Sequence, residues 1–425
     1  MMLVSRFDDT LTQQDSNPTL LGYSKFMSPF GTNIIESLGN PALFSSDYHS
    51  TLKAYSAELQ QIFQSHQHTV IVGGRYQAGW NETESELDRV LQGTVTDQHI
   101  DTDLSRVSLY AYEHWQILEP LRLSAGVSYD HLTYPRNIDT APITTGEDSK
   151  HQVSPKAGLI YTPAKDTRLR AMYSQSLGGV FFDNSIRLEP TQLGGFNQAF
   201  RSAIPESVAG LVPGTSFEAW GVGLDQVIRQ TRSYLTIEGQ FLNSDATRTV
   251  GLLRNSDINN PVLDTASGTR QSLDYREQAL IVAFNQLVHE EWALGVRYKL
   301  THAELDSQYL ELPVDLADRR GLNDNTSATL HQLDLYAIYN HRCGFFARFD
   351  AIWSRQANAG YTSDLPGDNF WHYDVAVGYR FLQRRAEVRL ALLNLSDRDY
   401  KLNPLTLYHE LARERTFTAG LKFYF

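Results

Sequence analysis

Charged side chains that alternate with apolar residues are the groups in this 425-residue chain with the most capacity for chemistry. Such groups could bind a polar or charged solute through ion pairs and hydrogen bonds, or could pair with one another along a hydrated wall. Exposed aromatic rings could add contacts for flat or sugar-like ligands. The candidate solute-binding residues are Arg168, Arg170, Arg297, Arg348, Asp350, Asp374, Arg380 and Trp220.

Motifs for catalysis or metal binding do not stand out. The chain contains no GxSxG, HExxH, Walker A, GxGxxG or EF-hand spacing. His66 and His68 lie in a predicted short turn with no neighbouring carboxylate, and the pair Asp101 and Asp103 lies in a predicted loop, where ordinary solvation explains them. We therefore expect no enzymatic activity, no metal site and no cofactor.

The composition excludes several classes of protein. The chain is 41% hydrophobic, yet its mean hydropathy is -0.36 and it has no run of eighteen apolar residues, which excludes membrane-spanning helices. Its single cysteine, Cys343, excludes an internal disulfide. A net charge of -12 with no stripe of Lys and Arg argues against a nucleic-acid partner.

The charged candidates belong to segments that alternate strictly between apolar and polar residues. Residues 121–130, 292–300, 344–353 and 371–381 follow this pattern. A period of two is typical of a β-strand with one apolar and one wet face. Val377, for example, is predicted to face lipid and Gly378 the interior, so that Arg should be tolerated better at position 378.

The carboxyl-terminal segment 415–425 shows the same alternation and ends on an aromatic residue. An ordinary core strand would leave its apolar face uncovered here, whereas a bilayer would cover it. Repetition of the pattern predicts an all-β fold, a transmembrane antiparallel β-barrel of about sixteen strands. Lipid-facing positions are costly for charges, so the charged candidates are assigned to the barrel interior.

Connection lengths give a second indication of a barrel, because short and long connections alternate along the chain. Outer-membrane barrels have short periplasmic turns and long extracellular loops, which places the carboxyl terminus in the periplasm. Residues 1–47 are read as a first strand followed by a long outer loop, and residues 48–425 as the barrel. Short turns are expected at 65–67, 119–120, 163–166, 229–231, 288–290, 341–343 and 383–385. Long loops are expected at 81–101, 134–151, 178–214, 244–271, 305–327, 356–369 and 397–411.

Four stretches point to a particular family. They are 154–176 (SPKAGLIYTPAKDTRLRAMYSQS), parts of 205–245 (PESVAGLVPGTSFEAWGVGLDQ and RSYLTIEGQFLNSD), 393–400 (LNLSDRDY) and the ending RTFTAGLKFYF. In order and spacing they resemble the carboxyl-terminal β-barrel of TonB-dependent outer-membrane receptors, from about residue 154 onward. Ser396 departs from the pattern, which usually has Phe at that position.

The resemblance implies uptake of a scarce extracellular solute across the bacterial outer membrane. It implies as partners the lipid of that membrane, the barrel assembly machinery and a TonB-type energy-coupling system that acts through a plug. The assembly signal would comprise Phe417, Leu421, Phe423 and Phe425. Neither a plug nor a signal peptide is recognised, since Arg6, Asp8 and Asp9 interrupt the first fourteen residues.

Two other functions stay open on the sequence. Without a plug, the barrel could act as a porin-like passive channel for small polar solutes. A soluble β-rich module that binds carbohydrate would also use many short strands, although it would not explain so many apolar outward positions.

Overall fold

The computed structural model describes residues 1–16, 18–28, 34–41, 44–89, 93–179, 186–198, 212–360, 367–400, 402, 405 and 414–423. Within these residues the chain forms twenty strands and one short helix. In chain order they are β1 (Met2–Asp15), β2 (Gly22–Met27), β3 (Ile34–Gly39), β4 (Phe44–Gln64), β5 (His68–Arg89), β6 (Gly93–Leu118), β7 (Leu121–Asn137), β8 (Thr144–Ala164), β9 (Thr167–Leu177), β10 (Gln192–Leu193), β11 (Phe196–Asn197), β12 (Ser216–Ile228), β13 (Ser233–Arg254), β14 (Thr265–Leu287), β15 (Trp292–Tyr309), α1 (Val314–Arg319), β16 (Asp324–Asn340), β17 (Phe345–Ala359), β18 (Asn369–Phe381), β19 (Ala386–Leu393) and β20 (Thr416–Phe423).

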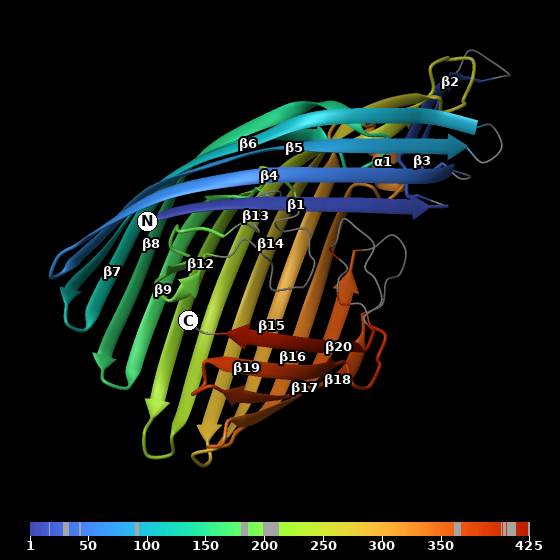
Figure 1. Ribbon diagram of the computed structural model, residues 1–425. Helices are drawn as coiled ribbons and strands as arrows, with labels where there is room; N and C mark the ends of the chain where they lie inside the picture. Colours follow the sequence, from blue (N-terminus) through green and yellow to red (C-terminus); the bar gives the residue numbers. More distant parts are fainter. Residues whose placement is uncertain are drawn as a thin grey trace.

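Sixteen strands form one antiparallel wall. Eighteen strands share a sheet, but β2 and β3 form a hairpin that touches β13 over only two residue pairs, and the others follow one another as β1, β4 to β9 and β12 to β20. The wall begins at β1, which pairs with β4, and ends at β20, which pairs with β19. It curves around an interior (Figure 1). The predicted all-β antiparallel barrel fold is confirmed.

The two faces of the wall differ as the alternation predicted. On β18, Trp371, Tyr373 and Val377 are exposed, whereas the intervening His372 and Ala376 are buried. Along the wall the exposed face is rich in large apolar side chains, and the opposite face carries most of the buried polar groups. An apolar outer surface and a polar inner surface are the arrangement that a bilayer requires of a barrel. We call the second surface the inner face.

The short turns lie where they were predicted, but several strands extend into the segments predicted as long loops. Residues 81–89 and 93–101, for example, belong to β5 and β6, which pair as far as Arg89 and Gly93. Likewise β13 continues to Arg254 and β15 to Tyr309. Their outward positions are polar, as with Glu82, Glu84 and Glu86 on β5, so they lack the apolar outer face that marks a strand of such a barrel, although their backbones pair just as well. Short turns gather at one rim and β2, β3 and α1 at the other (Figure 1).

Residues 1–47 combine three features. β1 belongs to the wall, β2 and β3 form their hairpin within the stretch predicted as a loop, and β4 has already begun at Phe44. The predicted boundary after residue 47 therefore falls inside β4. Among the described residues, no helix is long and apolar enough to cross a membrane.

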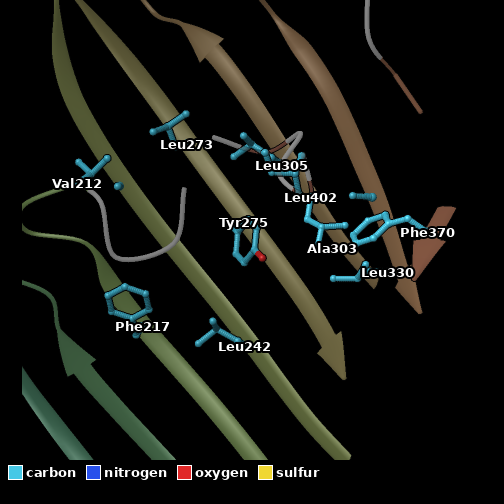
Figure 2. Close-up of a cluster of buried hydrophobic side chains, with 13 residues drawn as sticks. Val212, Phe217, Leu242, Leu273, Tyr275, Ala303, Leu305, Leu330, Phe370 and Leu402 are labelled. Atoms are coloured by element: carbon cyan, nitrogen blue, oxygen red, sulfur yellow. The ribbon is translucent and has the colours of Figure 1, made fainter. Parts of the chain in front are cut away.

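The inner face is not polar throughout, which the sequence did not lead us to expect. Toward the rim of the long connections, β12 to β16 and β18 contribute an apolar cluster that includes Phe217, Tyr275 and Phe370 (Figure 2). Val212, Leu402 and Leu405, from the connections after β9 and β19, pack on this cluster and are at most 4% exposed. Parts of the long connections thus fold back onto the wall and cover apolar side chains there.

Candidate functional site

Part of the connection between β9 and β12 lies against the inner face. We call residues 186–198 the inner segment; it contains the β10–β11 hairpin. The hairpin turns at Gly194 and Gly195, whose φ angles of +56° and +82° favour glycine, and a Cβ on Gly194 would lie 2.2 Å from the carbonyl oxygen of Ala171. Its apolar anchors, Leu193 and Phe196, are buried. They pack with Tyr110, Tyr112 and Met172.

Glu58 of β4 holds the beginning of the inner segment. Its carboxylate accepts hydrogen bonds from the backbone N–H groups of Leu188 (2.8 Å) and Glu189 (3.0 Å), and from the Tyr110 hydroxyl (2.7 Å). Gln60 donates from Nε2 to the carbonyl oxygen of Leu188 (2.6 Å). Because Glu58 is only 2% exposed, these bonds form in a poorly hydrated environment, where they are strong.

Glu189 forms a buried ion pair with Lys156 of β8. Lys156 Nζ lies 3.3 Å from Glu189 Oε1, and the two side chains are 3% and 11% exposed. The Tyr112 hydroxyl donates to the same oxygen (2.6 Å), and Lys156 Nζ lies 5.5 Å from the centre of the Tyr112 ring. Burial alone would raise the pKa of Glu189, but the charge of Lys156 and the Tyr112 hydrogen bond outweigh it and lower that pKa.

Arg170, a predicted site residue, is the third anchor of the inner segment. Its guanidinium donates to Asp225 (2.8 Å), to Glu238 (2.6 Å) and to the carbonyl oxygen of Gly195 (3.0 Å). It also lies over the Phe196 ring, 4.7 Å from its centre. The structure therefore gives Arg170 a role in holding the chain's own inner segment.

Four other predicted residues come together on β15, β17 and β18. Arg348 bonds Asp350 (2.6 Å), Asp350 faces Asp374 across the β17–β18 pair, and Arg297 faces Asp334 across the β15–β16 pair. Arg380 pairs with Glu387 (2.9 Å) closer to the short turns. Asp374 accepts a hydrogen bond from the backbone N–H of Asn394 (2.8 Å), so the ion pairs of this group are Arg348–Asp350 and Arg380–Glu387.

The remaining predicted residues lie apart from this group. Arg168 is exposed near the short turn that precedes β9. Trp220 is 49% exposed on the apolar outer surface, where its ring centre is 4.2 Å from that of Tyr173. It does not face the interior, because Phe217 and Gly221 of β12 occupy the inner face and position 220 alternates with them. The predicted contribution of Trp220 to solute binding inside the barrel does not fit this position.

The residues assigned to the assembly signal share one face of β20. Phe417, Leu421 and Phe423 are 67%, 60% and 51% exposed, which is consistent with a strand that presents an apolar face outward. Phe425 lies outside the described residues. Whether these side chains are recognised during assembly stays a prediction.

Two cavities at the rim of the long connections form the best candidate for solute binding. One of about 290 Å³ and one of about 590 Å³ share Tyr134, Arg136, Asp148 and Arg248 in their walls. The smaller is mainly apolar, with Phe7, Leu11 and Tyr48, whereas the larger is mainly polar. Concave sites that combine aromatic, apolar and a few fixed polar groups are typical of small-molecule binding.

Carboxylates and one histidine come close together on the exterior of β5 and β6. Glu82, His99 and Asp101 have potential ligand atoms within 4.8 Å of one another, and all three residues are exposed. Asp101 belongs to the pair considered from the sequence. Exposed acidic groups of this kind are common without a metal, so they do not change the expectation that the chain needs none.

Sequence reasoning missed Glu58, Lys156, Glu189 and Arg248. Lys156 was visible only as part of the SPKAGL stretch, and Glu189 lay in a predicted loop. Their partners are far away in sequence: 131 residues separate Glu58 and Glu189. A charged residue at a position that the alternation predicts to face inward could have marked Glu58 and Lys156 as candidates.

Comparison with known proteins gives both a family match and fold matches. Residues 5–203 match the family model described as TonB dependent receptor-like, beta-barrel. This match begins well before residue 154, where the motif resemblance began. No curated protein matches the sequence.

Three solved structures illustrate the shared fold. They are the ferric yersiniabactin uptake receptor FyuA from Yersinia pestis (TM-score 0.53, 12% identity, 99% of this chain and 62% of that chain), the copper transporter OprC (TM-score 0.52, 12% identity, 100% and 63%) and the open form of the ferric-catecholate import receptor Fiu from E. coli K12 (TM-score 0.50, 12% identity, 100% and 59%). This chain therefore spans less than two thirds of the length of each of these proteins.

Proposed function

We propose that this chain, a β-barrel of the TonB-dependent receptor type, takes up a scarce extracellular solute across the bacterial outer membrane. The observation that supports this most is the pair of rim cavities, which lie near the long connections of a wall with an apolar exterior. A solute bound there would be positioned at the entrance to the interior. The similar folds belong to proteins named for copper transport and for ferric chelate uptake, which favours a metal or a metal chelate.

Orientation follows from the two rims. Short turns on the periplasmic side and long connections outside would place the cavities toward the extracellular medium and the carboxyl terminus in the periplasm. Energy coupling through a plug, contact with outer-membrane lipid and recognition of Phe417, Leu421, Phe423 and Phe425 by the assembly machinery complete the proposal. Residues 48–425 would act as the barrel, together with β1.

A passive porin-like channel is less well supported. The inner segment occupies part of the interior and is held by Glu58, Lys156 and Arg170 through buried bonds. This segment leaves less room for diffusion than an empty barrel would. A soluble carbohydrate-binding module is disfavoured by the many large apolar side chains on the exterior of the wall, such as Trp292 and Trp371.

Uptake can be tested in cells that carry or lack the gene. We expect its deletion to reduce accumulation of a labelled copper ion or ferric chelate under limitation, and the intact gene to restore it. A protonophore should abolish the restored uptake, because energy coupling depends on the inner-membrane gradient. Uptake that survives the protonophore would indicate a passive channel, and unchanged accumulation of every labelled solute after deletion would refute transport of this class.

A further inference from the structure

The larger rim cavity lies where β9 and β12 end before their neighbours β8 and β13. β12 pairs with β13 only up to Asp245, and β8 pairs with β9 only from Lys156 onward, whereas β13 continues to Arg254 and β8 begins at Thr144. The space of about 590 Å³ between these extensions is lined by Tyr134, Arg136, Asp148, Thr247, Arg248, Thr249, Thr269, Arg270 and Glu311, among others.

The lining has a surplus of positive charge. Three arginines, Arg136, Arg248 and Arg270, face two acids, and one of these, Asp148, already accepts from Arg136 at 3.3 Å. The whole chain, in contrast, carries a net charge of -12. A cationic cavity in an acidic protein favours a negatively charged group, and so favours a metal chelate with free acidic groups over a bare metal ion.

Arg248 is fixed in place but incompletely bonded. Its Nε donates to Gln271 Oε1 (2.8 Å), and Gln271 Nε2 donates in turn to Ser307 Oγ (2.7 Å). The Arg248 Nη1 nitrogen is buried and has no hydrogen-bond partner. A charged donor oriented by a neighbour and left unsatisfied is a typical feature of a site that awaits an acceptor.

Thr269 provides a second, independent donor beside the same cavity. It is fully buried, and its hydroxyl oxygen has no hydrogen-bond partner. Thr269 and Arg248 share a face, because the Val250–Thr269 pair and the Arg248–Gln271 pair lie two rungs apart on the β13–β14 ladder. Two unsatisfied donors on one face, beside a cationic space, call for a ligand with several acceptor oxygens.

We propose that this cavity binds an oxyanion, a carboxylate or phosphate group, with Arg248 as its principal ligand and Thr269 as a second donor. This inference rests on the proposed uptake function, for which it would supply the substrate class: a solute that carries an exposed oxyanion. The Tyr134 ring and the Thr247 and Thr249 hydroxyls would contact the remainder of the solute.

The test uses the full chain purified in detergent, with inorganic phosphate and citrate as probes and calorimetric titration as the measurement. Wild type should bind at least one probe saturably. Arg248→Met should weaken that binding about tenfold or more, since a charge-assisted bond is lost, and Thr269→Val should weaken it a few-fold. Arg248→Lys, which keeps the charge but loses the planar fork, should give an intermediate affinity.

Arg276→Met is the matched control. Arg276 belongs to the same strand, β14, but is 66% exposed, pairs with Asp274 and does not line the cavity. Its loss should leave probe affinity unchanged. All variants should keep heat-modifiable migration, which shows that the barrel has folded.

Two results would overturn the inference: no saturable binding of either probe, or equal weakening by Arg248→Met and Arg276→Met. Failure of the inference can be told apart from failure of the proposed function. If deletion of the gene abolishes uptake but neither probe binds, the function stands and the oxyanion site falls. If Arg248-dependent binding is found and uptake is unaffected by the deletion, the site stands and the transport role falls.

Discussion

Two parts of the inner face carry similar charged residues under different conditions. The covered wall, β4 to β9 with β12, lies under the inner segment, and its Lys156–Glu189 pair is 3% and 11% exposed. On the open wall, β15 to β18, the described parts of the connections cover only the apolar cluster near the rim, and the Arg348–Asp350 pair is 43% and 11% exposed. Loss of one partner of an ion pair should therefore reduce stability much more on the covered wall than on the open wall.

The largest effect is expected for Lys156→Met. Removal of the cation leaves Glu189 buried and uncompensated, which typically costs about 3–5 kcal/mol. The urea midpoint of the detergent-folded protein should fall accordingly. Lys165→Met, in the exposed turn between β8 and β9, is the control and should change little. The double variant Lys156→Met, Glu189→Gln should recover part of the loss; no recovery would argue that packing, not charge, dominates.

A smaller loss, about 1.5–3 kcal/mol, is expected for Glu58→Gln, because an amide replaces the carboxylate that accepts three hydrogen bonds. The inner segment should then detach more often. Leu193 is 1% exposed, so a cysteine introduced there becomes accessible only when the segment detaches. Cys343 is replaced by Ser in this experiment, so that position 193 carries the only thiol. Maleimide labelling at position 193 should be faster with Glu58→Gln than without it, and equal rates would mean that Glu58 does not hold the segment.

Arg380→Met should cost only about 1 kcal/mol or less, since the Arg380–Glu387 pair is half-hydrated, at 33% and 16% exposure. The measurement is again the urea midpoint. Should this variant destabilise the protein as much as Lys156→Met, the distinction between the covered and open walls would be wrong.

The smallest effect concerns Cys343, in the short turn between β16 and β17. A hydrogen bond from the Phe345 backbone, and then the His341 side chain, lower the pKa of its thiol. More thiolate is then present near neutral pH, so alkylation should be faster than for an ordinary thiol. His341→Ala should move the midpoint of the rate–pH profile upward. An unchanged midpoint would exclude His341 as a cause.

Cys343 also reports orientation, because it is exposed in a turn assigned to the periplasm. A membrane-impermeant maleimide should not label it in intact cells but should do so after the outer membrane is permeabilised. Labelling of intact cells would reverse the proposed topology.

Much of the wall could be read from local pattern. Trp371, Tyr373 and Val377 lie outward as the period of two requires, and every predicted short turn separates two strands. Alternation was less informative where packing intervenes. Gly378 does face inward, but a Cβ there would lie 2.3 Å from the Phe346 ring, so Arg should not be well tolerated at this position after all.

The candidate site was harder to foresee. Of the predicted residues, Arg170 proved to be an anchor of the inner segment, Arg348 and Asp350 pair with each other, and Trp220 lies outside. The sequence could show which residues share a strand face, since that is a property of neighbours two positions apart. It could not show which connection folds inward, because this depends on contacts between residues more than a hundred positions apart.

Residue order alone therefore established strands, turns, the apolar outer surface and the family resemblance, all of which follow from short-range periodicity and motifs. Three-dimensional folding determined the rest: the buried Glu58 and Lys156 contacts, the cover over one wall and the cavity beside Arg248. The physical reason is that burial sets the strength of ion pairs and hydrogen bonds, and burial arises only when distant strands and connections pack together.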